Sequence, residues 1–113
     1  MKIVQFKQWH CQLKFEEYAN NNRVCINLVN ADPITEDDIE WPAGTVPIAT
    51  ATVNISHVPL TADEIIIKNY SENEGMLNVL VEAGIISKPD RYVKSGFVEC
   101  PICKLLVDPK DYK

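Results

Sequence analysis

The sequence reads SENEGMLNVLVEAG from residue 71 to 84 and GFVECPICKLL from residue 96 to 106, and these two segments decide the fold. In the first, Ser71 and Glu74 have the spacing of a capping box. Apolar residues then recur at helical spacing, at Met76, Leu77, Leu80 and Val81. Gly84 is placed for a left-handed C-terminal cap. The first segment therefore predicts one main helix over about residues 72–83, and the second predicts a final strand.

Upstream of the helix the apolar residues alternate with polar ones, which is typical of half-buried strands. Residues 2–7, 9–18 and 23–29 predict an antiparallel meander, because the Asn20–Asn22 run is a turn signal. Further strands are predicted at residues 48–55 and 64–68, with a short one at residues 92–93. We expect an α+β fold, with a mostly antiparallel sheet of five to six strands and the helix packed on one face. Residues 1–113 form one domain in this interpretation, and the polar tail frays from about residue 108.

The charge balance excludes some classes of function. The chain has 113 residues, and its 16 acidic and 11 basic side chains give a formal net charge of -5. This balance argues against direct nucleic-acid binding, which needs a surplus of Lys and Arg facing phosphates.

The chain has no apolar run of about 18 residues that could cross a bilayer, and its first residues lack the apolar segment of a secretory leader. We therefore expect a cytoplasmic protein with no membrane partner, either a monomer or a homodimer formed by pairing of edge strands.

An acidic, proline-containing loop is predicted over about residues 30–47, with one helical turn from Thr35 to Ile39 started by the pair Thr35 and Asp38. Long loops in compact domains are often functional. The carboxylates could engage Arg or Lys on a partner, and an exposed tryptophan is a common binding hot spot. The predicted binding residues are Asp32, Glu36, Asp37, Asp38, Glu40 and Trp41. The more ordinary alternative is that the carboxylates are only solvated and that Trp41 covers the sheet.

Cys100 and Cys103 form a C-x-x-C pair, which is half of a structural zinc site. The candidates for further ligands are Cys11, Cys25, His10 and His57. If residues 97–106 form an unbroken strand, however, Cys100 and Cys103 point to opposite faces and behave as small apolar residues. A redox dithiol is less favoured, because such pairs normally lie at a helix N-terminus. We expect no cofactor, and zinc is the alternative.

No catalytic arrangement is evident in the sequence. His10 and His57 lie in no nucleophile or metalloprotease motif, and the four glycines are too far apart for a phosphate-binding loop. The carboxylates at Asp37, Asp38 and Glu40 lack the spacing of a calcium loop. We therefore expect that the protein is not an enzyme.

Three segments carry a family resemblance: MKIVQFKQWHCQLKF (residues 1–15), YSENEGMLNVLVEAGI (residues 70–85) and SGFVECPICKLL (residues 95–106). Together they resemble a small domain family of unknown function carried by phages, plasmids and integrative elements of Gram-positive bacteria. The acidic loop at residues 30–47 is an addition to that pattern, and an apolar residue is typical of the family where Cys100 stands here. The resemblance brings no catalytic residue with it.

This resemblance implies a genomic setting, in which small acidic proteins often bind a host protein. Our leading hypothesis is a noncatalytic binding protein that targets a host protein, such as an anti-CRISPR inhibitor of a defence nuclease or another counter-defence factor. The expected partner is a basic protein that handles nucleic acid. The alternative is a zinc-stabilised structural or regulatory module built on Cys100 and Cys103.

Overall fold

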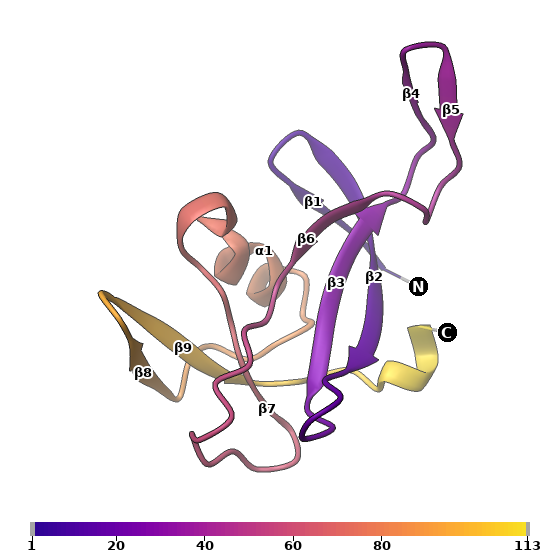
Figure 1. Cartoon of the computed structure of the whole chain (residues 1–113). Coiled ribbons are helices and arrows are strands. Elements are labelled where there is room, and N and C mark those ends of the chain that lie inside the picture. The colour runs from indigo at the N-terminus through magenta and orange to yellow at the C-terminus, as the bar shows by residue number, and fades with distance from the viewer. Residues whose placement is uncertain (1, 113) are drawn as a thin grey trace.

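The computed structural model describes residues 2–112 and has the α+β class expected from the sequence. Strands dominate and one α-helix packs beside them (Figure 1). In chain order the elements are β1 (Ile3–Phe6), β2 (Trp9–Glu17), β3 (Val24–Asn30), β4 (Ile34–Glu36), β5 (Ile39–Trp41), β6 (Pro47–Thr50), β7 (Glu64–Ile66), the 3-10 helix η1 (Ser71–Asn73), α1 (Met76–Glu82), β8 (Arg91–Ser95), β9 (Val98–Lys104) and the 3-10 helix η2 (Pro109–Tyr112).

The first sheet has the strand order β1-β2-β3-β6, and all of its neighbours are antiparallel. The meander predicted from the alternating apolar residues is therefore confirmed. The strand predicted over residues 48–55 is shorter, because β6 ends at Thr50. Beyond it, Thr52 forms a single bridge with Ile67, and this bridge joins the first sheet to the second.

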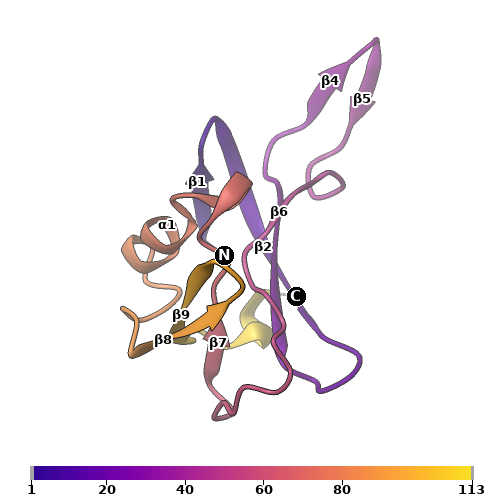
Figure 2. The same cartoon turned by 60° about the vertical axis from the view of Figure 1, so that its left-hand side comes forward.

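The second sheet has the antiparallel order β7-β9-β8 (Figure 2). The predicted single sheet of five to six strands is thus divided in two. The central strand β9 is covered on both faces, since Cys103 packs in one apolar cluster and Cys100 and Ile102 pack in another. The β-branched run Ile65–Ile67 is likewise buried on both sides, which agrees with the prediction of a well-covered strand.

The main helix is confirmed, but the capping box predicted at its start is absent. Ser71 opens the 3-10 helix η1 with a positive φ of 58°, and no side chain of a capping box bonds to the helix. Gly75, at φ 95°, separates η1 from α1, and the first turn of α1 is instead capped from outside, where the Leu77 N–H donates to Asn69 Oδ1 at 2.9 Å. The predicted C-terminal cap is present, because Gly84 has a φ of 76°.

The main core lies between the first sheet, β7 and α1. One face of the sheet contributes Phe6, Leu13 and Leu28, and α1 contributes Met76 and Leu80, all of which are buried. At about 25 cal/mol per Å² of apolar surface removed from water, this cluster is the main source of stability.

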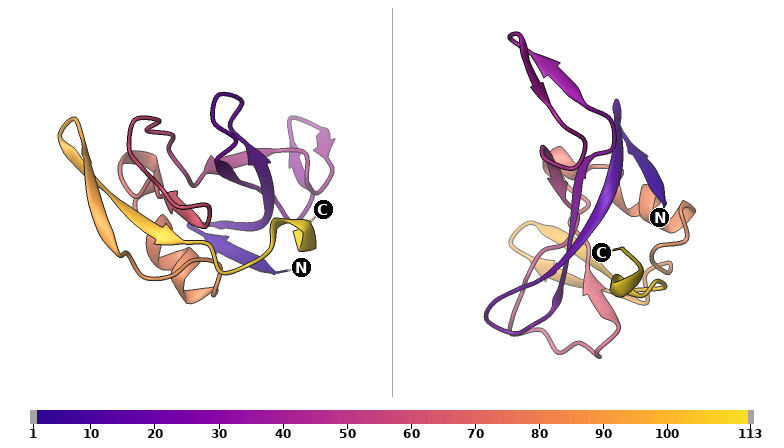
Figure 3. Two further views of the ribbon diagram at one scale, coloured as in Figure 1. Left: turned by 90° about the horizontal axis from the view of Figure 1, so that it is seen from below. Right: turned by 90° about the vertical axis from the view of Figure 1, so that its right-hand side faces the viewer.

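The tail was predicted to fray from about residue 108, and this stays a prediction. Residues 109–112 form η2, which lies against β2 (Figure 3). The ring of Tyr112 meets that of Phe15 edge-on, with the centroids 5.1 Å apart. None of the helices in the described part of the chain has the length and apolar character that a bilayer crossing requires.

Candidate functional site

The acidic segment at residues 30–47 is a β-hairpin that projects from the body of the protein (Figures 1 and 2). Strands β4 and β5 pair through Ile34 with Trp41, Thr35 with Glu40, and Glu36 with Ile39. The helical turn predicted from Thr35 to Ile39 is therefore wrong. Asp37 and Asp38 form a two-residue turn instead, and their φ values of 52° and 64° are both positive, as in a type I′ turn. Aspartate tolerates this conformation, because its short polar side chain can bond locally.

Asn30 clamps the base of this hairpin. Its side chain is buried, with 2% of its surface exposed. Its Oδ1 accepts a hydrogen bond from the Val46 N–H at 2.7 Å, and its Nδ2 donates to the carbonyl oxygens of Asp32 at 2.9 Å and Pro42 at 3.0 Å. The Asn30 backbone also accepts a bond from the Gly44 N–H at 2.7 Å. One residue of the main sheet thus holds both ends of the projecting segment.

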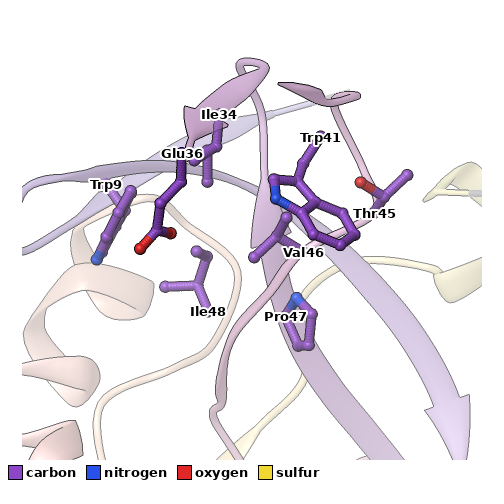
Figure 4. Close-up of a pocket in the computed structure, with 8 residues that line it drawn as sticks. All are labelled: Trp9, Ile34, Glu36, Trp41, Thr45, Val46, Pro47 and Ile48. Carbon is purple, nitrogen blue, oxygen red and sulfur yellow. The ribbon is translucent and has the colours of Figure 1, made fainter. Parts of the chain in front are cut away.

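A cleft of about 510 Å³ opens between the hairpin and the edge of the first sheet (Figure 4). Its walls are mostly apolar and come from β2, β4, β5, β6 and the segment before β6. The lining residues are Trp9, Ile34, Glu36, Trp41, Thr45, Val46, Pro47 and Ile48. A pocket of this size and character is typical of ligand sites, which usually span about 300–1,000 Å³.

The cleft is a continuation of the core-facing side of the first sheet. Trp9 and Ile48 are half-buried and also pack against the main core cluster. The cross-strand pair Ile34 and Trp41 faces them from the hairpin, and 45% of the Trp41 surface is exposed. Trp41 therefore lines a cleft that is open to solvent, so it neither caps the sheet completely nor stands free of it.

The predicted acidic residues divide among four places. Glu36 lines the cleft, where Figure 4 shows its carboxylate in the opening between the two indole rings. Asp37 and Asp38 lie at the tip of the hairpin, and Glu40 lies on the opposite face of the hairpin, because it belongs to the neighbouring cross-strand pair. Asp32 lies at the base of the hairpin, with its Oδ2 3.1 Å from His10 Nδ1.

The candidate zinc ligands are dispersed. Because β9 is an unbroken strand, Cys100 and Cys103 project from opposite faces into two separate apolar clusters. Within residues 2–112 no group of three or more His, Cys, Asp or Glu side chains is gathered as a metal site would need. Cys11 and Cys25 are buried in the first sheet, and His57 is exposed in the connector before β7.

Burial also changes the acidity of the thiols. It raises the pKa of Cys11 and Cys100, and burial together with the nearby Asp90 carboxylate raises the pKa of Cys103 to about 11. A thiol with a raised pKa is a poor nucleophile and a poor metal ligand at neutral pH, because the thiolate is the reactive form. His10, the imidazole with a carboxylate neighbour, is exposed, and the described residues that line the cleft beside it include Asp32 and Trp9 and no cysteine.

Sequence reasoning missed three parts of this site: Trp9, Ile48 and Asn30. The alternation of β2 places Trp9 on the inner face, whereas the alternation predicted over residues 48–55 puts Ala49 inward and Ile48 outward, and nothing in the sequence indicates that a hairpin would fold over them. Asn30 gave no distinctive signal, because an Asn two residues before an Asp-Pro pair is ordinary in a loop. Two adjacent aspartates flanked by Thr-Glu and Ile-Glu are the signal that could have predicted the turn.

Comparison of the chain with models of protein families, with curated proteins and with solved structures gave no match, so the resemblance to a mobile-element family stays a prediction.

Proposed function

We propose that this protein is a noncatalytic binding protein that engages a basic host protein through the β4–β5 hairpin. The observation that carries the proposal is the projection of the hairpin from the body with large apolar side chains left in solvent. The exposed fractions are 54% for Ile39 and 45% for Trp41. Exposed apolar side chains that stand together on a projecting element mark interaction sites in many proteins.

The charge of the hairpin supports a basic partner. Asp37 and Asp38 lie at its tip. Glu36 and Glu40 lie on its two strands, and Asp32 lies at its base. The whole chain carries a formal net charge of -5, so its field reinforces that of the hairpin. Complementary charge of this kind steers a partner during encounter and selects against acidic partners.

The clamp at Asn30 supports the same proposal. A contact element binds more tightly when it does not have to be ordered during association. The three side-chain hydrogen bonds of Asn30 hold the two ends of the hairpin in one arrangement before any partner arrives. The proposed partner is a nucleic-acid-handling protein of a bacterial host, and inhibition of a defence nuclease is the specific form of this proposal.

The test uses two charge-matched double variants. D37N/D38G removes two carboxylates from the tip and retains a turn, because Asn-Gly is the preferred type I′ pair. E17Q/E99Q removes two exposed carboxylates from other strands. Each protein is immobilised and exposed to a Gram-positive cell lysate at low and high salt.

We expect the unaltered protein and E17Q/E99Q to retain the same basic nucleic-acid-binding protein, and D37N/D38G to lose it. Retention should fall as salt rises, because charge steering is screened beyond about 10 Å at 0.1 M salt. Equal retention by the two double variants would contradict the proposal.

A further inference from the structure

Both tryptophans of the chain line the same cleft. Trp9 comes from β2 and Trp41 from β5, and the sequence contains two tryptophans in all. Between them lies Glu36, the one charged side chain among the described residues of the lining (Figure 4). Two indoles and a carboxylate therefore face a common opening.

Glu36 lacks an internal counter-charge. Within residues 2–112 no Lys, Arg or His side chain forms an ion pair with it, whereas Glu16, Glu64 and Glu72 each have one. The Glu36 carboxylate is thus free to accept hydrogen bonds from a cation that enters the cleft.

The face of an indole ring also attracts a cation, because the ring quadrupole is negative above and below its plane. A carboxylate beside two such faces favours a positively charged guest over a neutral or anionic one. Charge complementarity therefore defines the class of ligand that the cleft would take.

A guanidinium fits these groups better than an ammonium does. It is planar, so it stacks on an indole, and its edge presents paired N–H donors that match the two oxygens of a carboxylate. The apolar walls at Ile34, Val46 and Ile48 would cover the methylene stem of the same side chain.

We infer that the cleft between the β4–β5 hairpin and the first sheet is a receptor site for an arginine side chain of the partner protein, with its guanidinium against the indoles and paired to Glu36. This inference rests on the proposed function, because it names the group by which the basic partner would be recognised. The tip carboxylates would steer the partner, and the cleft would recognise its arginine.

The two tryptophans make the test direct, because the intrinsic tryptophan fluorescence of the protein arises from this cleft. The probe is the peptide acetyl-Gly-Arg-Gly-amide, titrated into the protein. In the two matched peptides, citrulline or lysine replaces the arginine. Citrulline has a similar shape without the charge. We expect the arginine peptide to quench the tryptophan fluorescence saturably. The protein should bind this peptide about tenfold more tightly than the citrulline peptide, and more tightly than the lysine peptide.

Two conservative variants complete the test. E36Q keeps the size of the side chain and removes its charge inside the cleft. E99Q makes the same change on β9 of the second sheet, where Glu99 is exposed and lies outside the cleft. We expect E36Q to weaken binding of the arginine peptide about tenfold, and E99Q to change it less than about twofold.

The inference is overturned if the citrulline or lysine peptide binds as tightly as the arginine peptide, if the arginine peptide does not saturate, or if E36Q and E99Q behave alike. These failures differ from failure of the proposed function. If the protein does not bind the arginine peptide but its capture of the host protein still depends on Asp37 and Asp38, the proposed function stands without the arginine site. Arginine binding without hairpin-dependent capture would instead contradict the proposed function alone.

Discussion

Replacement of Asn30 by alanine tests whether the hairpin is a fixed part of the fold. The substitution removes three side-chain hydrogen bonds, to the Val46 N–H and to the carbonyl oxygens of Asp32 and Pro42, at 2.7, 2.9 and 3.0 Å. A neutral hydrogen bond contributes about 0.5–1.5 kcal/mol net, so the three together contribute about 1.5–4.5 kcal/mol, with a central value of about 3 kcal/mol. Because only 2% of the residue is exposed, water replaces these bonds poorly.

Two measurements locate this loss. If the hairpin base unfolds together with the core, urea denaturation of N30A shows a free energy of unfolding lowered by about 3 kcal/mol. If the base opens alone, the same energy appears as faster hydrogen exchange of the β4 and β5 amides, by about a hundredfold for 3 kcal/mol. In that case the exchange of β2 and α1 amides stays unchanged.

The matched control is N27A, the same change on the same strand. Asn27 is half-buried, and its Oδ1 accepts a 2.8 Å bond from the exposed Thr50 hydroxyl. We expect it to cost less than about 1 kcal/mol, because water can take over a bond at the sheet surface. Unchanged stability together with unchanged exchange of the hairpin in N30A would refute the idea that Asn30 clamps it.

Three further predictions concern the body of the protein. L80A removes a fully buried side chain of α1 and should lower the free energy of unfolding by about 2–5 kcal/mol in urea denaturation. The Arg91 guanidinium, with the Thr61 backbone N–H, lowers the pKa of Glu64 to about 2. The ionised Glu64 therefore stabilises the fold above the ordinary carboxyl pKa, and this stabilisation is lost as pH falls toward 2. R91Q should therefore lose less stability than the unaltered protein when urea denaturation is compared between about pH 6 and about pH 2. Because Cys100 and Cys103 face opposite sides of β9, equimolar zinc should leave the unfolding temperature unchanged, and iodoacetamide should label both thiols only after denaturation, as read by mass spectrometry.

The parts of the fold that the sequence predicted are those in which local pattern and tertiary packing agree. The alternation at Trp9, Cys11 and Leu13 has the period of a strand, and the same residues face the core. Gly84 has the conformation expected of a helix cap, because few other residues adopt it without strain.

The errors arose where two local signals were compatible with one sequence. Ser71 and Glu74 fit a capping box, but Glu74 leaves the helical conformation with a ψ of 128°, so η1 ends before α1 begins at Met76. Thr35 and Asp38 fit the start of a helical turn, yet three residues on each side of the Asp37–Asp38 turn pair as strands. Local spacing could not decide these cases, because the outcome depends on what the segment packs against.

The cleft depends on a relation between distant segments that no local pattern contains. Trp9 and Trp41 are 32 positions apart, and they face one another because Asn30 fixes the hairpin over the sheet edge. Under the proposed function, the clamp, the cleft and the acidic tip would therefore act on binding in different ways. A change at the tip should alter the salt dependence of association, since tip charges act at long range. A change at Glu36, which is exposed in the free protein, should alter the dissociation rate, since loss of a charge contact that becomes buried in the complex mainly affects how long the complex lasts. N30A should weaken both effects together, because it loosens the segment that carries them.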